Sequence, residues 1–405
     1  MRVIFGYGYS PNMEKEECLL LIENETPDGS KRSSGGLGRL VALDVARGLA
    51  VLGMYVQHFA LNEKNAAIVS GNTTLLFVLC GGISYSLMAQ GMRDKGIEKT
   101  AFRSRMLARA VFIDLIGYTL IMLNTPFGVI LPAYAALFVL ALPLVYRSTR
   151  VLVTTAICLI LLGPPVMVLG GSLFSEAFLL YDIAGGPMSA LALSSVFVAG
   201  MAIGRLDLTS THTALSLAGS GSIMLIISIM LSKFVLPDLS QTFENWLISV
   251  QGVNSIELDP YAIWPYNVEP PMWHSLLLTS SHSASSFQTL MGLGAAFFAL
   301  GIVCIISKKI SKLVIPFALV GRMALTMYAI QFVVVWGIQL AGGNFSLGEI
   351  PFGDMLIVII ALVVGWLLSC LPKGPLEASL RHFDSFFTLR NQTERCISNH
   401  LKEKI

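Results

Sequence analysis

Asp44, Arg47 and His58 are the residues whose types and spacing in this sequence best suit chemistry. Asp44 and Arg47 are three residues apart, so on a helix they share one face and can form an ion pair. His58 follows Arg47 by eleven residues, which corresponds to roughly 16 Å along a helix. Ionised groups in so apolar a segment must face protein or water. The spacing therefore predicts an ion pair toward one end of a helix and an imidazole, able to act as a general base, toward the other.

Each of these residues also has a purely structural interpretation. The ion pair can pin helices together without contacting a substrate, since buried ion pairs often serve architecture alone. His58 can hydrogen-bond a loop at a membrane interface. A second imidazole, His282, stands in a Ser-rich stretch that is mainly a helix-capping signal, and Asp114 and Arg322 are further charges inside apolar segments. Both interpretations stay open at the level of the sequence.

The elements that must position these residues are membrane helices. Of the 405 residues, 54% are hydrophobic and only 13% are charged, which excludes an ordinary soluble enzyme. The mean hydropathy is +0.71, and apolar runs of about 20 residues recur along the chain. We therefore predict an all-α polytopic membrane protein with about ten transmembrane helices. These are 40–60, 68–90, 106–124, 129–146, 151–170, 188–204, 213–236, 287–306, 313–340 and 353–371.

The distribution of basic residues predicts the orientation of these helices. With the N-terminus in the cytoplasm, the outer loops receive only Lys64 and Lys233, while nearly all other Lys and Arg residues fall on the cytoplasmic side. By the positive-inside rule, both termini are expected to be cytoplasmic. The most basic loop carries a run of cations that this rule alone would explain: Arg93, Arg103, Arg105 and Arg109.

The chain divides into a membrane domain and two tails. We predict a cytoplasmic N-terminal tail at 1–38, a transmembrane domain at 39–372 and a cytoplasmic C-terminal tail at 373–405. One long outer loop, 237–286, contains five carboxylates, no Lys or Arg, and several Trp and Tyr residues. This composition is typical either of a structured lid over the membrane domain or of an aromatic belt at the interface.

Several kinds of site are not indicated by the sequence. It contains no His or Cys pair with zinc-ligand spacing, no P-loop and no dinucleotide-binding glycine pattern, so no metal is predicted. Nucleic acid is not an expected partner.

Three segments carry a resemblance to a known family. They are Leu43–His58 (LDVARGLAVLGMYVQH), Val320–Gln331 (VGRMALTMYAIQ) and Gly374–Arg381, which contains Gly-Pro-Leu-Glu. In this order they resemble YeiB-like membrane proteins, which are related to the heparan-alpha-glucosaminide N-acetyltransferases. The resemblance implies a transmembrane acyltransferase of the bacterial inner (plasma) membrane. Such an enzyme takes acetyl from acetyl-CoA in the cytoplasm and passes it to a hydroxyl or amine of a cell-envelope sugar or glycolipid on the outer side.

The resemblance also implies roles for the residues singled out above. His58 becomes the expected general base, with Asp44, Arg47 and His282 as further catalytic candidates. The related lysosomal enzyme has its catalytic His in the loop after the first helix, whereas 62–68 contains none here, so either His58 takes this role or the base comes from elsewhere. The phosphates of acetyl-CoA require cations, and the expected binding residues are Arg93, Arg103, Arg105, Arg109 and Arg322.

A competing function remains open at this stage. Paired charges inside the membrane are also expected of a secondary transporter or lipid flippase. The expected partners of the acyltransferase are acetyl-CoA, the sugar or glycolipid acceptor and membrane lipid, and the sequence leaves a homodimer open.

Overall fold

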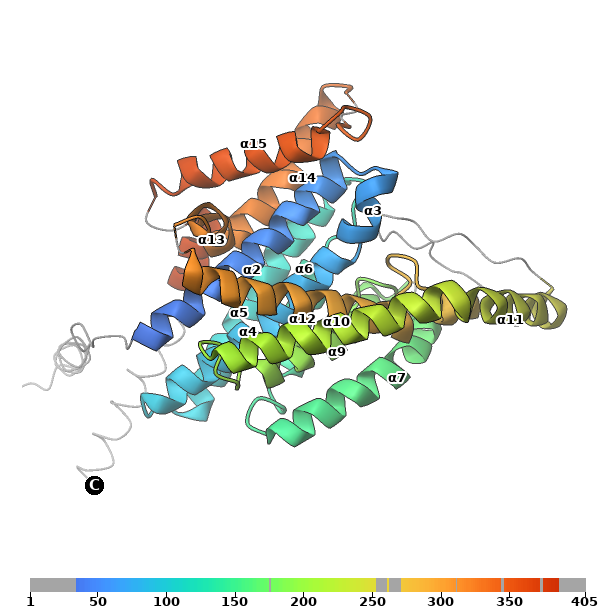
Figure 1. Ribbon diagram of the computed structural model, residues 1–405, viewed down its shortest axis with the longest axis horizontal. Helices are drawn as coiled ribbons and strands as arrows, with labels where there is room; N and C mark the ends of the chain where they lie inside the picture. Colours follow the sequence, from blue (N-terminus) through green and yellow to red (C-terminus); the bar gives the residue numbers. More distant parts are fainter. Residues whose placement is uncertain are drawn as a thin grey trace, which may run out of the picture.

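The computed structural model describes residues 34–174, 176–252, 261, 271–310, 312–343, 346–371 and 374–385, and this part of the chain is helical without a strand (Figure 1). Five helices form its first half: α2 (Ser34–Phe59), α3 (Glu63–Val69), α4 (Asn72–Asp94), α5 (Lys99–Ile121) and α6 (Leu131–Leu140). They are followed by α7 (Thr149–Leu173), α8 (Phe178–Ala184), α9 (Ala190–Ile203), α10 (Thr211–Phe234) and α11 (Leu236–Gln251). The last elements are the 3₁₀ helix η1 (Trp273–Leu277), α12 (Ser286–Lys309), α13 (Ile315–Arg322), α14 (Ala324–Leu340) and α15 (Gly353–Leu368), and residues 375–385 are also helical.

A helix lies in each of the ten segments that the hydropathy predicts, but not all of these helices have the length and composition of a span. Four stretches do: 63–94, 149–173, 211–234 and 286–309. The bent pair of α13 and α14 makes a fifth if it is counted as one span. The structure therefore supports a helical membrane protein with four or five candidate spans, and the ten-span arrangement stays a prediction.

The first two long helices form the centre of the molecule and run antiparallel. Arg47 on α2 donates a hydrogen bond to Ser84 on α4, and further along the pair a Cβ at Gly53 would meet Thr73. On its other side α4 packs on α9, where a Cβ at Gly82 would lie 2.0 Å from the carbonyl oxygen of Phe197. The small residues that mark this segment in the sequence thus allow backbones to approach closely, as in other membrane helices.

The predicted span at 313–340 is broken. Helices α13 and α14 meet at an angle of 78°. The break falls at Met323, not at Pro316, because Pro316 occupies the first turn of α13, where its missing N–H is not needed. Helix α13 packs on α2 through two glycines, since a Cβ at Gly48 would lie 2.0 Å from the Phe317 oxygen and one at Gly321 would lie 1.7 Å from the Asp44 oxygen.

The helix at 375–385 packs against the membrane domain. The carboxylate of Glu377 accepts hydrogen bonds from the backbone N–H groups of Leu325 and Thr326 at 2.7 and 3.1 Å, and so caps the first turn of α14. At the other end of this helix the buried carboxylate of Asp384 pairs with Arg105 and Arg109 of α5. The three sequence segments that carry the family resemblance therefore meet in space, because α2 contacts α13 and the last segment caps α14.

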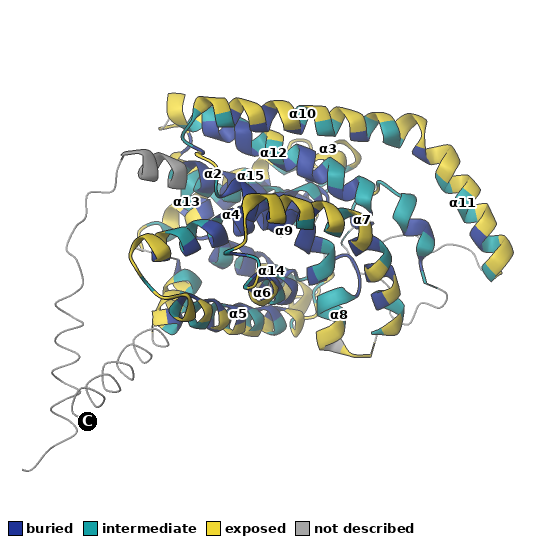
Figure 2. Cartoon of the chain, turned by 90° about the horizontal axis from the view of Figure 1, so that it is seen from below, coloured by how far each residue is buried: buried dark blue, intermediate teal, exposed yellow. Residues whose placement is uncertain are grey.

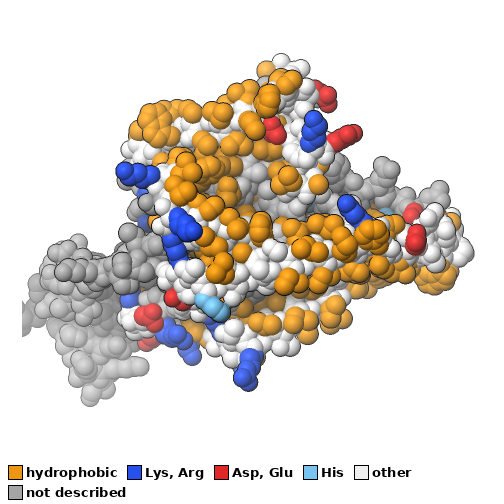
Figure 3. Space-filling model, in the orientation of Figure 1, with side chains coloured by type: hydrophobic (Ala, Val, Ile, Leu, Met, Phe, Trp, Pro, Cys, Tyr) orange, Lys and Arg blue, Asp and Glu red, His pale blue; other side chains and the backbone are white. Residues whose placement is uncertain are grey.

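The outer surfaces of the bundle have the character expected of a lipid-facing protein. Exposed residues cover the outward faces of α5, α7 and α10 (Figure 2), and many of them are large hydrophobics. Hydrophobic side chains spread across the face formed by α10, α12 and α15, whereas Lys and Arg gather chiefly at the left end of the described part of the molecule in this view (Figure 3). This separation agrees with an apolar band between two polar ends.

Candidate functional site

One cavity opens beside His58, near the end of α2. It has a volume of about 330 Å³, and its lining residues include Phe59, Pro126, Phe127, Tyr261 and Gln339. The imidazole of His58 stacks on Phe127 with 4.0 Å between ring centroids and 6° between planes. The edge of Phe332 packs against it at 5.8 Å. The two aromatic rings therefore hold the imidazole in one plane, and the imidazole lines the cavity. We call this space the outer cavity.

Behind the imidazole lies a cluster of buried polar side chains. Gln57, the neighbour of His58 on α2, places its Nε2 atom 3.1 Å from Nε2 of His282. The His282 ring interacts electrostatically with His58, and the side chain of Gln331 on α14 lies within hydrogen-bonding reach of it. Nδ1 of His58 and both polar atoms of the Gln331 amide are nevertheless buried without a hydrogen-bond partner. Three elements far apart in the sequence thus converge on one imidazole.

The Ser-rich stretch before α12 explains how His282 reaches this cluster. Ser285 is the N-cap of α12 and accepts a hydrogen bond from the Gln288 N–H at 3.0 Å, as the capping signal predicts. The hydroxyls of Ser283 and Ser285 both donate to the carbonyl oxygen of Leu278. These bonds hold His282 at a φ of 61°, in the left-handed region that few non-glycine residues adopt.

The ion pair predicted on α2 is present halfway along the helix pair. Nη1 of Arg47 lies 2.9 Å from Oδ1 of Asp44, and the other guanidinium nitrogen donates to Ser84 of α4. The side chains of this pair keep 24% and 21% of their surface accessible, so the pair is only partly buried. Arg322, at the end of α13, lies close enough to interact electrostatically with Asp44. The ion pair therefore joins α2, α4 and the helix break.

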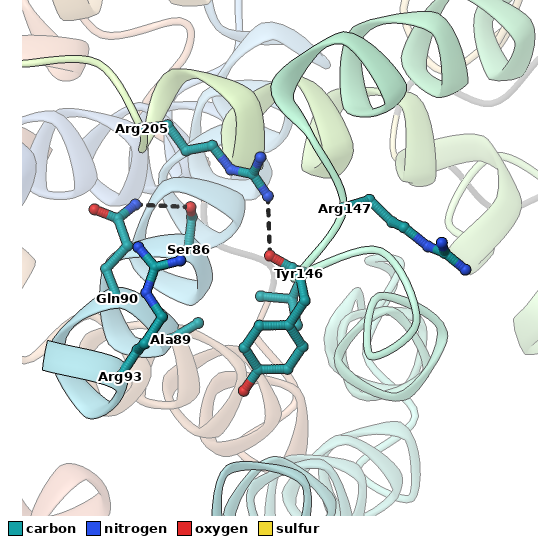
Figure 4. A pocket seen from close by; sticks show the side chains of 8 residues that line it. Ser86, Ala89, Gln90, Arg93, Tyr146, Arg147 and Arg205 are labelled. Atoms are coloured by element: carbon teal, nitrogen blue, oxygen red, sulfur yellow. Dashed lines mark hydrogen bonds between the residues drawn. The ribbon is translucent and has the colours of Figure 1, made fainter. Parts of the chain in front are cut away.

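A second cavity lies at the opposite end of α4 from the outer cavity (Figure 4). It has a volume of about 240 Å³, and we call it the basic cavity. It is lined by Ser86, Ala89, Gln90, Arg93, Val145, Tyr146, Arg147 and Arg205. Arg93, Gln90 and Ser86 come from the last turns of α4, and Arg205 donates to the Val145 carbonyl oxygen at 2.9 Å, while Arg147 extends away from the others.

The electrostatics of the basic cavity favour an anion. Burial lowers the pKa of Arg205, and the nearby charge of Arg93 lowers it further. An anion between the two guanidinium groups would offset both effects. Lys99 places its ammonium over the ring of Tyr146, 5.2 Å from the centroid. The same tyrosine also interacts electrostatically with Arg103. Guanidinium groups in such a cluster are suited to binding phosphate oxygens.

The arginines that the sequence predicts to bind phosphate do not all lie together in the structure. Arg93 lines the basic cavity, and Arg103 lies near its Tyr146. Arg105 and Arg109 instead bind Asp384, with nitrogen–oxygen distances of 3.2 and 2.6 Å, and so hold the helix at 375–385. The cations that the sequence did not single out are Arg147 and Arg205.

Asp114, the remaining charge inside an apolar segment, lies on another part of α5. It interacts electrostatically with Asp182 of α8, and between them the hydroxyl of Tyr118 donates to Asp182 at 2.5 Å. Burial raises the pKa of Asp182, and the hydrogen bond from Tyr118 opposes this shift. Of the two further charges inside apolar segments, Arg322 is near the ion pair of α2, whereas Asp114 is near Asp182.

The structure therefore brings His58 and His282 together at one end of α2 and places Asp44, Arg47 and Arg322 together near its middle. Sequence reasoning missed Gln331, although it lies inside a segment quoted for the family resemblance. Among the residues that the structure describes, no three His, Cys, Asp or Glu side chains are grouped so that they could hold a metal ion.

Comparison with known families gives one match. Residues 245–385 match the model of DUF418, described as a protein of unknown function. This family includes YeiB-like membrane proteins. The matched stretch contains His282, Arg322, Gln331 and the helix at 375–385, but it leaves out α2 with His58. No curated protein matches the chain.

Proposed function

We propose that this protein is a transmembrane acetyltransferase of the plasma membrane. In this proposal acetyl-CoA binds from the cytoplasm at the basic cavity, and the acetyl group is transferred to a hydroxyl or amine of a cell-envelope sugar or glycolipid at the outer cavity. Ten spans with both termini in the cytoplasm would give this orientation. The observation that carries the proposal is that a cavity lined by guanidinium groups and a cavity lined by an imidazole lie at opposite ends of the same helix pair, α2 and α4.

The chemistry assigned to each end follows from its residues. At the outer cavity His58 takes the proton from the acceptor hydroxyl or amine as that atom bonds to the acetyl carbon. The carbon–sulfur bond of the thioester then breaks, and the CoA thiolate leaves and recovers a proton from the imidazolium. The aromatic rings of Phe127 and Tyr261 offer flat apolar surfaces to a sugar face.

The distance between the two cavities sets a condition on this mechanism. Arg93 lies nine residues beyond Ser84 on α4, and His58 lies eleven beyond Arg47 on α2, so they are about 30 Å apart along the helix pair. The arm between the diphosphate and the thioester of CoA has about 13 bonds and spans roughly 16 Å when extended. A diphosphate in the basic cavity therefore brings the thioester only to the level of Arg47. We infer that CoA docks first and then advances along the ion pair toward His58.

A secondary transporter is the second candidate, and the broken helix favours it. In transporters with broken helices, the exposed first turn of a half-helix binds an anionic substrate. Here the break lies between α13 and α14. The first turn of α14, however, is occupied by the carboxylate of Glu377, which accepts the N–H groups that a substrate would need. The contact with Glu377 thus gives the break a structural role. The argument for a transporter is weaker for this reason.

Acetyl-CoA turnover by the purified protein tests the proposal against transport. In detergent with a glycolipid extract from the cell envelope, we expect release of CoA together with an acetylated lipid, both measured by mass spectrometry. In proteoliposomes, accumulation of a solute without consumption of acetyl-CoA would instead identify a transporter. CoA that copurifies with the protein would support the enzyme directly.

Removing two of the three guanidinium groups that line the basic cavity should weaken docking of CoA. For Arg93→Gln combined with Arg205→Gln we expect the KM for acetyl-CoA to rise at least about tenfold, because a hydrogen bond to a charged group contributes about 1.5 to 3 kcal/mol. The kcat should change little, since the thioester still reaches the same site. Arg150→Gln is the matched control, because Arg150 is exposed nearby but does not line the cavity. Equal KM values in all three proteins would remove the basic cavity from the proposal.

The predicted orientation can be tested with a cysteine on α11. Asn245 is exposed on this helix, at the end of the molecule that should face outward. Asn245→Cys should react with a membrane-impermeant maleimide in intact cells, above the background of the native cysteines. Lys95→Cys, in the loop that should face the cytoplasm, should react only after permeabilisation. The opposite pattern would show that the molecule is inverted in the membrane.

A further inference from the structure

Two neighbouring buried groups, one on His58 and one on Gln331, lack hydrogen-bond partners. Nδ1 of His58 is buried and unpaired, although the ring itself lines the cavity. The side chain of Gln331 is 0% exposed, and neither its oxygen nor its nitrogen makes a hydrogen bond. Buried polar groups in folded proteins are nearly always paired, so an unpaired amide next to an unpaired imidazole nitrogen requires an explanation.

We propose that Gln331 is the positioning residue of His58, and that its side-chain oxygen is the acceptor of the Nδ1–H of the imidazole. This inference rests on the proposed function, because it assigns His58 as the general base. A hydrogen bond at Nδ1 fixes the tautomer in which Nε2 carries the lone pair. Since Nδ1 is the buried nitrogen and the ring lines the outer cavity, Nε2 is the nitrogen that can meet the acceptor.

The packing around the imidazole leaves Gln331 as its partner. Phe127 stacks over the ring and Phe332 packs its edge against it, so the ring is held in its plane and bonds only along it. His282 is close by, but its Nε2 already pairs with Gln57. The side chain of Gln331 comes from α14 and lies within hydrogen-bonding reach of the imidazole.

A neutral partner also suits the chemistry of a base in an apolar site. A carboxylate at this position would stabilise the imidazolium and hold the proton on the ring. An amide oxygen orients the ring without that charge, so the imidazole stays neutral and ready to accept a proton. A neutral base at His58 therefore requires, at position 331, a side chain that has an acceptor oxygen and no charge.

Kinetics of two Gln331 variants separate positioning from a structural role. Gln331→Met keeps the shape of the side chain but removes the acceptor, and should lower kcat about tenfold to a hundredfold with an unchanged KM for acetyl-CoA. Gln331→Glu restores an acceptor but adds a charge that raises the pKa of the imidazole. It should therefore move the acidic limb of the pH–rate profile to higher pH and recover most of the rate only above that limb. His282, which interacts electrostatically with His58, and Tyr261, across the cavity, are unchanged in both variants.

Ser228→Ala is the control, because the hydroxyl of Ser228 on α10 is another buried group without a partner. It should leave kcat and the pH profile as in the wild type. If Gln331→Met also keeps the wild-type kcat, or if both Gln331 variants lose activity only in proportion to folded protein, the positioning role is wrong.

The nitrogen-15 NMR spectrum of His58 tests the inference without any turnover. In labelled protein in lipid, with His58→Ala used to assign the signal, His58 should carry its proton on Nδ1, and Gln331→Met should abolish this preference. A wild-type protein that turns over no acetyl-CoA but shows this tautomer would refute the proposed function and keep the hydrogen bond. A His58 proton on Nε2 in the wild type would overturn the inference itself.

Discussion

Replacing His58 with Ala is expected to lower the rate of acetyl transfer by at least about a hundredfold, because a positioned acid–base group contributes roughly a hundredfold to ten-thousandfold. Binding of acetyl-CoA should survive, since the basic cavity lies at the other end of α4. The measurement is single-turnover transfer, compared with the affinity for acetyl-CoA from calorimetry. A purely structural histidine would instead lower the melting temperature and reduce activity only in proportion to folded protein.

His282→Ala is the matched control for this experiment. His282 is the other imidazole of the cluster, but the structure places it behind His58, against Gln57. Replacing His282 should reduce the rate less than replacing His58, because His282 affects the reacting atoms only through neighbouring side chains. Wild-type turnover in His58→Ala together with complete loss in His282→Ala would assign the base to the segment before α12.

The sequence predicted the helices of this fold well because their signals are local. Runs of apolar residues, the Ser285 cap and the small residues of α4 all act within a few turns of the chain. The break inside the predicted span 313–340 is of a different kind. Its position at Met323 depends on a long-range contact, since Glu377 caps the helix that starts just after it. No local signal near Met323 carries that information.

The candidate site was predictable only in part, for the same reason. His58 and the ion pair of α2 stand out because charged and imidazole groups are rare in apolar segments. Gln331 is an uncharged residue in an apolar helix, and its significance comes from an imidazole on a different helix. Arg105 and Arg109 show the opposite case. In the sequence they resemble phosphate-binding residues, but in the structure both bind the buried carboxylate of Asp384.

Replacing Gly321 with Val should abolish folding or activity. The reason is that the site depends on the close contact between α2 and α13 at this glycine. A Cβ at Gly321 would lie 1.7 Å from the Asp44 carbonyl oxygen, and the obstructing atom is backbone, so one helix must move. Overpacking of this kind costs about 1 to 3 kcal/mol, and more where backbone must shift. Moving α13 also carries Arg322 away from Asp44, with which it interacts.

The matched control for this prediction is Gly337→Val on α14. Gly337 is also inside a helix, but a Cβ there would meet nothing within 4 Å. Both variants change helix propensity alike, so the difference between them isolates the helix contact. We expect Gly337→Val to resemble the wild type in detergent yield, melting temperature and acetyl-CoA turnover, and Gly321→Val to lose most of its folded protein. If the two variants behave alike, α2 and α13 do not need their close approach, and the position of the ion pair must be set by other contacts.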